Sequence, residues 1–166
     1  MPEKDVIIAE SKVKYIGVFD LLLLYKKLQR WIKERRFAEV KELKYVERIK
    51  PFGKILDLVW KTSRSEVGEY LSLELEVKIL AVGINDVEVD TPSGKLKLNK
   101  ADLEITFSSA LVRNNKKEWA DTSLLKRIYE RYIIVNQIEH FKIELYKDTE
   151  KLVDETKNFL ALYRFK

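Results

Sequence analysis

The C-terminal part of the chain constrains the fold most, because residues 121–165 contain neither glycine nor proline and carry apolar residues at helical spacing. A straight α-helix of about 44 residues would be about 66 Å long, at about 1.5 Å per residue. A compact domain of 166 residues is only roughly 40 Å across. We therefore expect this helix to break, to bend around a core, or to project toward a partner.

Polar residues interrupt the apolar stripe at one place. The stripe repeats about every 3.5 residues, close to the coiled-coil period, but residues 147–151 are all polar. We predict a bend or a projecting segment there, with Asp148 or Thr149 as the cap of a second helix. Residues 122–146 are expected to cover a sheet, and residues 149–166 to form a separate or projecting helical segment.

The middle of the chain predicts an antiparallel sheet. Every second residue from Leu71 to Ala81 is apolar, and polar residues alternate with them up to Lys78, which is typical of a strand with one buried and one solvated face. Residues 90–94 (Asp-Thr-Pro-Ser-Gly) predict a hairpin turn. The other expected strands are residues 6–9 and 13–18 (as one strand or two), 55–62, 96–98 and 103 to about 112, followed by a polar loop at residues 113–118.

Two segments near the N-terminus differ in how clearly they can be interpreted. Residues 20–34 predict a helix, with Asp20 as N-cap and apolar residues at spacings of three and four. In residues 38–50, Val40, Leu43 and Val46 lie three residues apart, which fits a helix, whereas the neighbouring elements are predicted strands and favour a strand. The sequence favours a strand here and leaves the helix open.

The order of these elements predicts an α+β fold. We expect a curved antiparallel β-meander of about five to six strands, covered by an N-terminal helix and the long C-terminal helix. A chain of 166 residues is expected to form a single domain, residues 1–166.

Composition narrows the class of protein. The absence of cysteine excludes disulfides, thiolate metal sites and cysteine nucleophiles. The residues after Met1 do not form a secretory signal, and no apolar run approaches the ~20 residues of a transmembrane helix, so a cytoplasmic location is expected. The charged fraction of 36%, rich in lysine and glutamate, is typical of thermophilic proteins.

The candidates for catalytic or metal chemistry are weak. His140 is the only histidine, so it cannot form a multi-histidine site and is expected at the surface. Glu74 and Glu76 share one strand face and could hold a hard cation, but Lys78 follows them, which favours a solvated charged face. The glycines are isolated and form no phosphate-binding loop. We expect no enzyme activity, no metal and no cofactor.

The charge of the chain is concentrated in residues 26–36. This segment has one carboxylate, Glu34, and six cations, so it accounts for the whole net charge of +5. The cations are Lys26, Lys27, Arg30, Lys33, Arg35 and Arg36. They could bind the phosphates of nucleic acid or an anionic membrane surface, or they could simply solvate the end of a helix.

Several short motifs resemble a small family of uncharacterised archaeal proteins. They are Val18-Phe19-Asp20 with Leu24-Tyr25 and Trp31, Pro51-Phe52-Gly53-Lys54, Asp86-Val87-Glu88-Val89, Asn99-Lys100, and Tyr132-Ile133-Ile134 with Ile138-Glu139. The order of elements also resembles helix-grip proteins, in which an antiparallel sheet wraps a long C-terminal helix. That second resemblance implies a cavity for an apolar ligand between sheet and helix.

These observations lead to three hypotheses about function. The first is a non-enzymatic binding or adaptor protein that presents its basic helix to an anionic macromolecule or surface. The second is a helix-grip-like carrier of a hydrophobic small molecule. The third is assembly with a second copy or another protein through apolar residues of the last helix, namely Leu152, Val153, Phe159, Leu160 and Tyr163.

Overall fold

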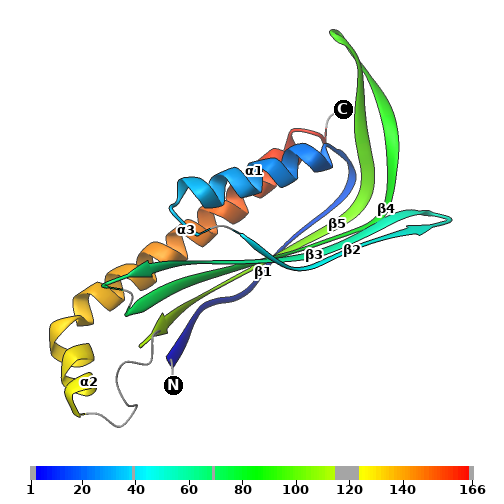
Figure 1. Cartoon of the computed structure of the whole chain (residues 1–166). Helices are drawn as coiled ribbons and strands as arrows, with labels where there is room; N and C mark the ends of the chain where they lie inside the picture. The colour runs from blue at the N-terminus through cyan, green and yellow to red at the C-terminus, as the bar shows by residue number, and fades with distance from the viewer. Residues whose placement is uncertain (1–2, 39, 69, 115–123, 165–166) are drawn as a thin grey trace.

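A curved five-stranded antiparallel sheet, which does not close into a barrel, forms the framework of the protein (Figure 1). The computed structural model describes residues 3–38, 40–68, 70–114 and 124–164. The strands are β1 (Glu3–Phe19), β2 (Lys41–Lys50), β3 (Gly53–Glu66), β4 (Leu71–Thr91) and β5 (Gly94–Arg113). Their order in the sheet is β1-β5-β4-β3-β2, so β2 to β5 form a meander and β1 pairs with the last strand.

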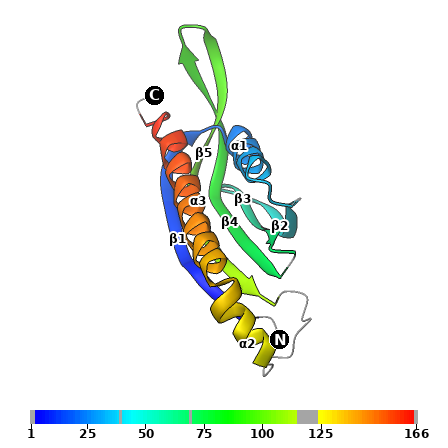
Figure 2. The same ribbon diagram turned by 90° about the vertical axis from the view of Figure 1, so that its left-hand side faces the viewer.

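Helices cover one face of this sheet. They are α1 (Leu21–Glu34), α2 (Leu124–Ile128), the π-helical turn η1 (Tyr129–Ile133) and α3 (Val135–Ala161). Figure 2 shows α1 and the C-terminal half of α3 side by side in front of the sheet, with α2 at the far end of the helical layer. The predicted α+β fold, with an N-terminal and a long C-terminal helix over an antiparallel sheet, is therefore confirmed.

The alternating residues of β4 and β5 supply the centre of the core. Ile79 lies opposite Ile105 and Val77 lies opposite Phe107, so large apolar side chains meet on the face that the helices cover. Trp60 of β3 extends this core toward α1, where its ring packs edge-on against Tyr25 with 4.8 Å between centroids.

Residues 41–50, which the sequence left between strand and helix, form strand β2. Tyr45 lies opposite Leu58 of β3, and the strand is exposed along most of its length because it is an edge of the sheet. A register shift between Glu42 and Lys44 breaks the alternation of side chains. Because most of this edge strand is exposed, its apolar residues do not have to alternate, which is why its sequence pattern did not identify a strand.

Two strands of the sheet are longer than the segments expected from the sequence. Residues 6–9 and 13–18, which the sequence left as one strand or two, form the single strand β1, whose register shifts near Val6, Ile8 and Ser11 mark irregular pairing between them. The expected strands 96–98 and 103 to about 112 both lie in β5. The hairpin that joins β4 to β5 extends beyond the other strands (Figure 1).

The predicted bend at residues 147–151 is wrong, because α3 is a continuous α-helix from Val135 to Ala161. Two of the five polar residues there, Asp148 and Thr149, are buried and have polar partners, whereas Lys147 and Lys151 are exposed. The Thr149 hydroxyl donates to the backbone oxygen of Leu145 at 2.7 Å, and Asp148 Oδ1 lies 3.5 Å from Arg35 Nη1. The α-helix is interrupted earlier, at η1 and at Ile134, whose φ and ψ are −110° and 9°.

Candidate anion-binding face of the first helix

Local contacts fix the rotation of α1 about its own axis. Asp20 caps the helix as predicted, since its Oδ1 accepts a hydrogen bond from the Leu23 N–H at 3.0 Å. The N–H of Leu21 donates to Asn99 Oδ1 of β5 at 3.2 Å. The buried side of the helix consists of Leu24, Leu28, Trp31 and Ile32.

The six predicted cations do not share one surface. Lys26, Arg30 and Lys33 are exposed and follow a spacing of four and three residues, opposite the buried side of α1. We call these three residues the basic face. Arg36 is also exposed and follows the helix in a left-handed conformation, with φ at 67°.

Lys27 and Arg35 turn instead toward α3. The ammonium of Lys27 lies 5.3 Å from the centre of the Phe159 ring, within the range of a cation–π contact. Arg35 is half-buried, stacks 5.2 Å over Trp31 and faces Asp148. These two cations contribute to the packing of α1 on α3, so they are less free to meet a partner.

The basic face has no internal counter-charge. Within the described ranges, no carboxylate lies within 4.0 Å of Lys26, Arg30 or Lys33. Several cations of the sheet are paired across strands, for example Lys44 with Asp57 at 2.6 Å and Lys12 with Glu104 at 3.5 Å. The outer surface of α1 can therefore attract an anionic group without first breaking an ion pair.

The apolar residues expected to meet a protein partner lie mainly inside the molecule, which corrects that prediction. Leu152, Val153, Phe159 and Leu160 are buried, and Tyr163 packs partly buried against the same core. Residues 149–161 continue α3 beside α1, so they are not a projecting segment. Their exposure would require α1 to leave α3.

The first part of the C-terminal stripe was also predicted on the wrong surface. Leu125, Ile128 and Tyr132 were expected to cover the sheet, but they are exposed, whereas the later members Ile138 and Leu145 are buried. A π-helical turn holds about one residue more than an α-helical turn. Residues spaced to share one face of a continuous α-helix therefore point in different directions before and after η1.

The other candidates for chemistry lie on the surface. His140 is exposed, with Nε2 3.4 Å from Glu144 Oε2. Glu74 lies 3.8 Å from Lys4 and 3.9 Å from Lys61, and Glu76 lies 3.5 Å from Lys78. No group of three or more potential metal ligands occurs in the part of the chain that the structure describes.

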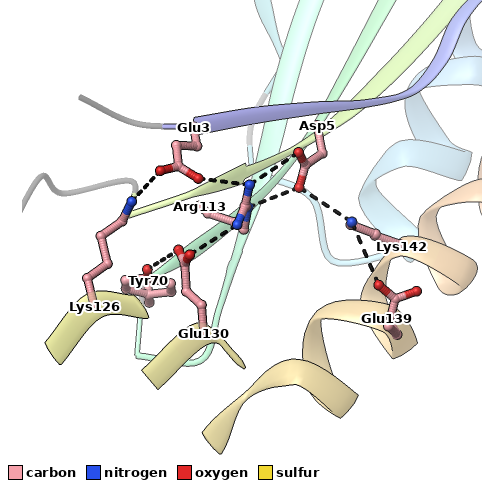
Figure 3. A network of polar contacts seen from close by, with 8 residues as sticks. All are labelled: Glu3, Asp5, Tyr70, Arg113, Lys126, Glu130, Glu139 and Lys142. Atoms are coloured by element: carbon pink, nitrogen blue, oxygen red, sulfur yellow. Dashed lines mark hydrogen bonds and ion pairs between the residues drawn. The ribbon is translucent and has the colours of Figure 1, made fainter. Parts of the chain in front are cut away.

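A partly buried ionic network joins β1, β5 and the helices at the far end of the sheet (Figure 3). Arg113 is its centre, 2.8 Å from Glu3, 3.0 Å from Asp5 and 3.1 Å from Glu130. Lys126, which is almost fully buried, pairs with Glu3. Lys142 of α3 adds a contact of 3.5 Å to Asp5.

Tyr70 completes this network by donating a hydrogen bond from its hydroxyl to Glu130 Oε1. Burial, followed by that hydrogen bond, raises the pKa of the Tyr70 hydroxyl well above its ordinary value. Sequence reasoning missed the network because its members are distant in the chain and Arg113 was assigned to a polar loop. The remainder of that predicted loop, residues 115–118, lies outside the described residues.

The sheet–helix interface is filled rather than hollow where the structure describes it. Large side chains such as Phe107, Leu103 and Phe19 are fully buried in it. A pocket between the two helices α1 and α3 has a volume of about 10 Å³, far below the ~300 Å³ of a small-molecule site. Larger hollows, of about 470 Å³ beside Ile32 and about 680 Å³ beside Tyr15, are lined in part by the exposed residues Lys33 and Lys14 and so lie at the surface. The carrier hypothesis therefore gains no support from this interface.

The fold and the basic face together define an α+β protein with a helix-covered antiparallel sheet and an unpaired cationic surface. No protein-family model matches the chain, and no curated protein matches it. One solved structure, an uncharacterized protein from Rhizobium leguminosarum, aligns over 97% of this chain and 98% of its own, with 11% identity and a TM-score of 0.22. A TM-score this low supports no conclusion about the fold or the function. None of the described helices is long and apolar enough to span a membrane.

Proposed function

We propose that the protein is a non-enzymatic binding or adaptor protein that uses the basic face of α1 to dock on an anionic macromolecule or surface. The observation that carries the proposal is the alignment of Lys26, Arg30 and Lys33 along the outer side of one helix, with no carboxylate within ion-pair distance among the described residues. Arrays of this kind attract phosphates at long range and release counterions on contact.

The packing of α1 supports a docking role. Its inward side is held by the buried residues Leu24, Leu28 and Trp31 and by the Asp20 cap, so the helix needs no rearrangement to present its cations. Because the three cations are exposed and no carboxylate of the described residues lies within 4.0 Å of them, a phosphate can bind without displacing a carboxylate. Binding of this kind is expected to be electrostatic and to weaken steeply with salt.

The test is the affinity of the full chain for RNA, duplex DNA and anionic vesicles over a range of salt concentrations. Lys26→Glu/Arg30→Glu/Lys33→Glu should lower the affinity for the bound ligand about tenfold or more at low salt. It should also reduce the salt slope on DNA by roughly two to three, at about 0.9 per phosphate contact.

A matched control changes the net charge equally at another place. Arg48, Lys97 and Lys100 are exposed and have no ion pair within the described part of the chain. The triple variant Arg48→Glu/Lys97→Glu/Lys100→Glu should bind like the native protein. Equal losses in the two variants would show that net charge alone is responsible, and unchanged affinity in the α1 variant would reject the proposal.

A further inference from the structure

The segment formed by α2 and η1 has an inverted polarity. Its charged residues Lys126 and Glu130 face the sheet, with side chains only 2% and 14% exposed. Apart from Tyr129, which packs against the core, its apolar residues face outward, and Leu124, Leu125 and Tyr132 are 69%, 72% and 70% exposed. We call the exposed apolar residues of this segment the apolar tip: Leu124, Leu125, Ile128, Tyr132 and Ile133.

This orientation is opposite to that of an ordinary surface helix, which turns its apolar side to the core. The ionic network holds it in place, because Lys126 pairs with Glu3 and Glu130 contacts both Arg113 and Tyr70 (Figure 3). Rotating the segment to bury its apolar side would break these partly buried ion pairs. A contiguous exposed apolar surface of this kind marks a site of interaction.

The charges beside the apolar tip indicate what kind of partner covers it. Arg127 and Arg131 are exposed, and within the described residues neither has a carboxylate within 4.0 Å. The guanidinium of Arg131 lies 5.7 Å from the centre of the Tyr132 ring. Since Glu130 is turned inward, the outer surface of this segment is apolar and cationic, without a carboxylate.

We propose that α2 and η1 insert the apolar tip into the interface of an anionic lipid bilayer. The aliphatic side chains and Tyr132 would enter the boundary between headgroups and acyl chains, while Arg127 and Arg131 would bind lipid phosphates. This surface is distinct from the basic face, because α1 packs beside residues 148–159 of α3, well beyond the tip along the helix.

Two other occupants fit the same surface less well. A symmetric dimer through the apolar tip would bring two copies of Arg127 and Arg131 into one small interface, to which this segment contributes no outward carboxylate to offset their charge. Nucleic acid would find two guanidiniums but mainly aliphatic side chains, which provide little stacking for bases. A bilayer satisfies both the apolar and the cationic groups at once.

The test is co-sedimentation of the full chain with phosphatidylcholine vesicles that contain 0% or about 30% phosphatidylglycerol. Leu125→Ser/Ile133→Ser should weaken binding to the anionic vesicles about tenfold or more, because two apolar side chains lose their burial. Arg127→Glu/Arg131→Glu should remove the preference for anionic lipid. The control Ile16→Ser/Ile49→Ser, at positions 79% and 82% exposed elsewhere on the sheet, should bind like the native protein.

A spectroscopic readout separates insertion from simple adsorption. The native protein has three tryptophans, so the readout is the difference in emission between Tyr132→Trp and the native protein. That difference spectrum should shift to shorter wavelength on anionic vesicles and stay unchanged with phosphatidylcholine alone. The inference is overturned if the tip variants bind like the native protein, or if no shift occurs. It is also overturned if light scattering shows a dimer that Leu125→Ser/Ile133→Ser dissociates, since a second copy would then cover the tip.

Discussion

The guanidinium of Arg113, at the end of β5, lies 3.1 Å from the carboxylate of Glu130 in η1. The same guanidinium contacts Glu3 and Asp5 at the start of β1. One cation thus joins the first strand, the last strand and the start of the C-terminal helices. Removing it would leave three carboxylates together without their common partner.

We predict that Arg113→Met lowers the free energy of unfolding by about 2–3 kcal/mol, since partly buried carboxylates lose their counter-charge. The free energy of unfolding of Arg113→Lys should lie between those of Arg113→Met and the native protein, because an ammonium restores the charge but not the planar, two-pronged geometry of the guanidinium. Urea denaturation measures both. Lys95→Met, which removes an exposed contact of 4.0 Å to Glu88, should change stability by less than about 0.5 kcal/mol; an equal loss would contradict the role of Arg113.

Tyr70 should make the protein sensitive to alkaline pH. Its pKa is raised in the folded state by burial and by Glu130, so the folded protein keeps a proton that the unfolded chain releases above about pH 10. The stability that it contributes is complete below that pH and is lost as the pH rises further. Tyr70→Phe should therefore show a shallower decline of unfolding free energy between about pH 9 and 11, measured by urea denaturation. Parallel curves for the two proteins would contradict this assignment.

Gly53 begins β3 at a point where the backbone of β4 comes very close. A Cβ at this position would lie 2.8 Å from the carbonyl carbon of Gly83, and its φ of +130° is unfavourable for other residues. Gly94 has a similar φ of +127° but no atom within 4 Å of such a Cβ. We predict that Gly53→Ala costs at least about 1 kcal/mol more than Gly94→Ala. Comparable thermal and urea midpoints in the two variants would contradict this prediction, because they would show that β3 and β4 can move apart at Gly53 at little cost.

Thr149 tests the continuity of α3. Because its buried hydroxyl bonds only to the backbone of its own helix, Thr149→Val should change the unfolding free energy by less than about 1 kcal/mol. Thr149→Asp should cost about 3 kcal/mol or more, since it buries a charge without a partner. If residues 147–151 formed a solvated bend, urea denaturation would find both substitutions nearly neutral.

The sheet and α1 could be predicted because their patterns are strictly local. Alternation in residues 71–81 and the Asp20 cap each depend on a few neighbouring side chains, and both are present as predicted. The unbroken helix at residues 147–151 could not be predicted in this way. Asp148 and Thr149 can be buried there because Arg35 and the backbone of Leu145 bind them, and Arg35 is distant in the chain.

The candidate surfaces likewise differ in how far local sequence patterns reveal them. The sequence located the cations of residues 26–36, but only the packing of α1 separates Lys26, Arg30 and Lys33 from Lys27 and Arg35. The outward side of α2 and η1 was missed, because it depends on a π-helical turn and on ion pairs to Glu3 and Arg113. Such contacts leave no periodic signal in the sequence.

The continuity of α3 sets a fixed distance within the molecule. Its 27 residues form a helix about 40 Å long, with α2 and η1 at one end and α1 packed beside the other half. The basic face and the apolar tip are therefore held roughly 30 Å apart along that axis. The helix α3 is continuous from Val135 to Ala161, and at the break at Ile134 the ion pair of Glu130 with Arg113 ties η1 to the sheet. A partner that binds both surfaces must present an anionic site to the basic face and an apolar site to the apolar tip at that separation. The protein therefore has the properties of a rigid spacer.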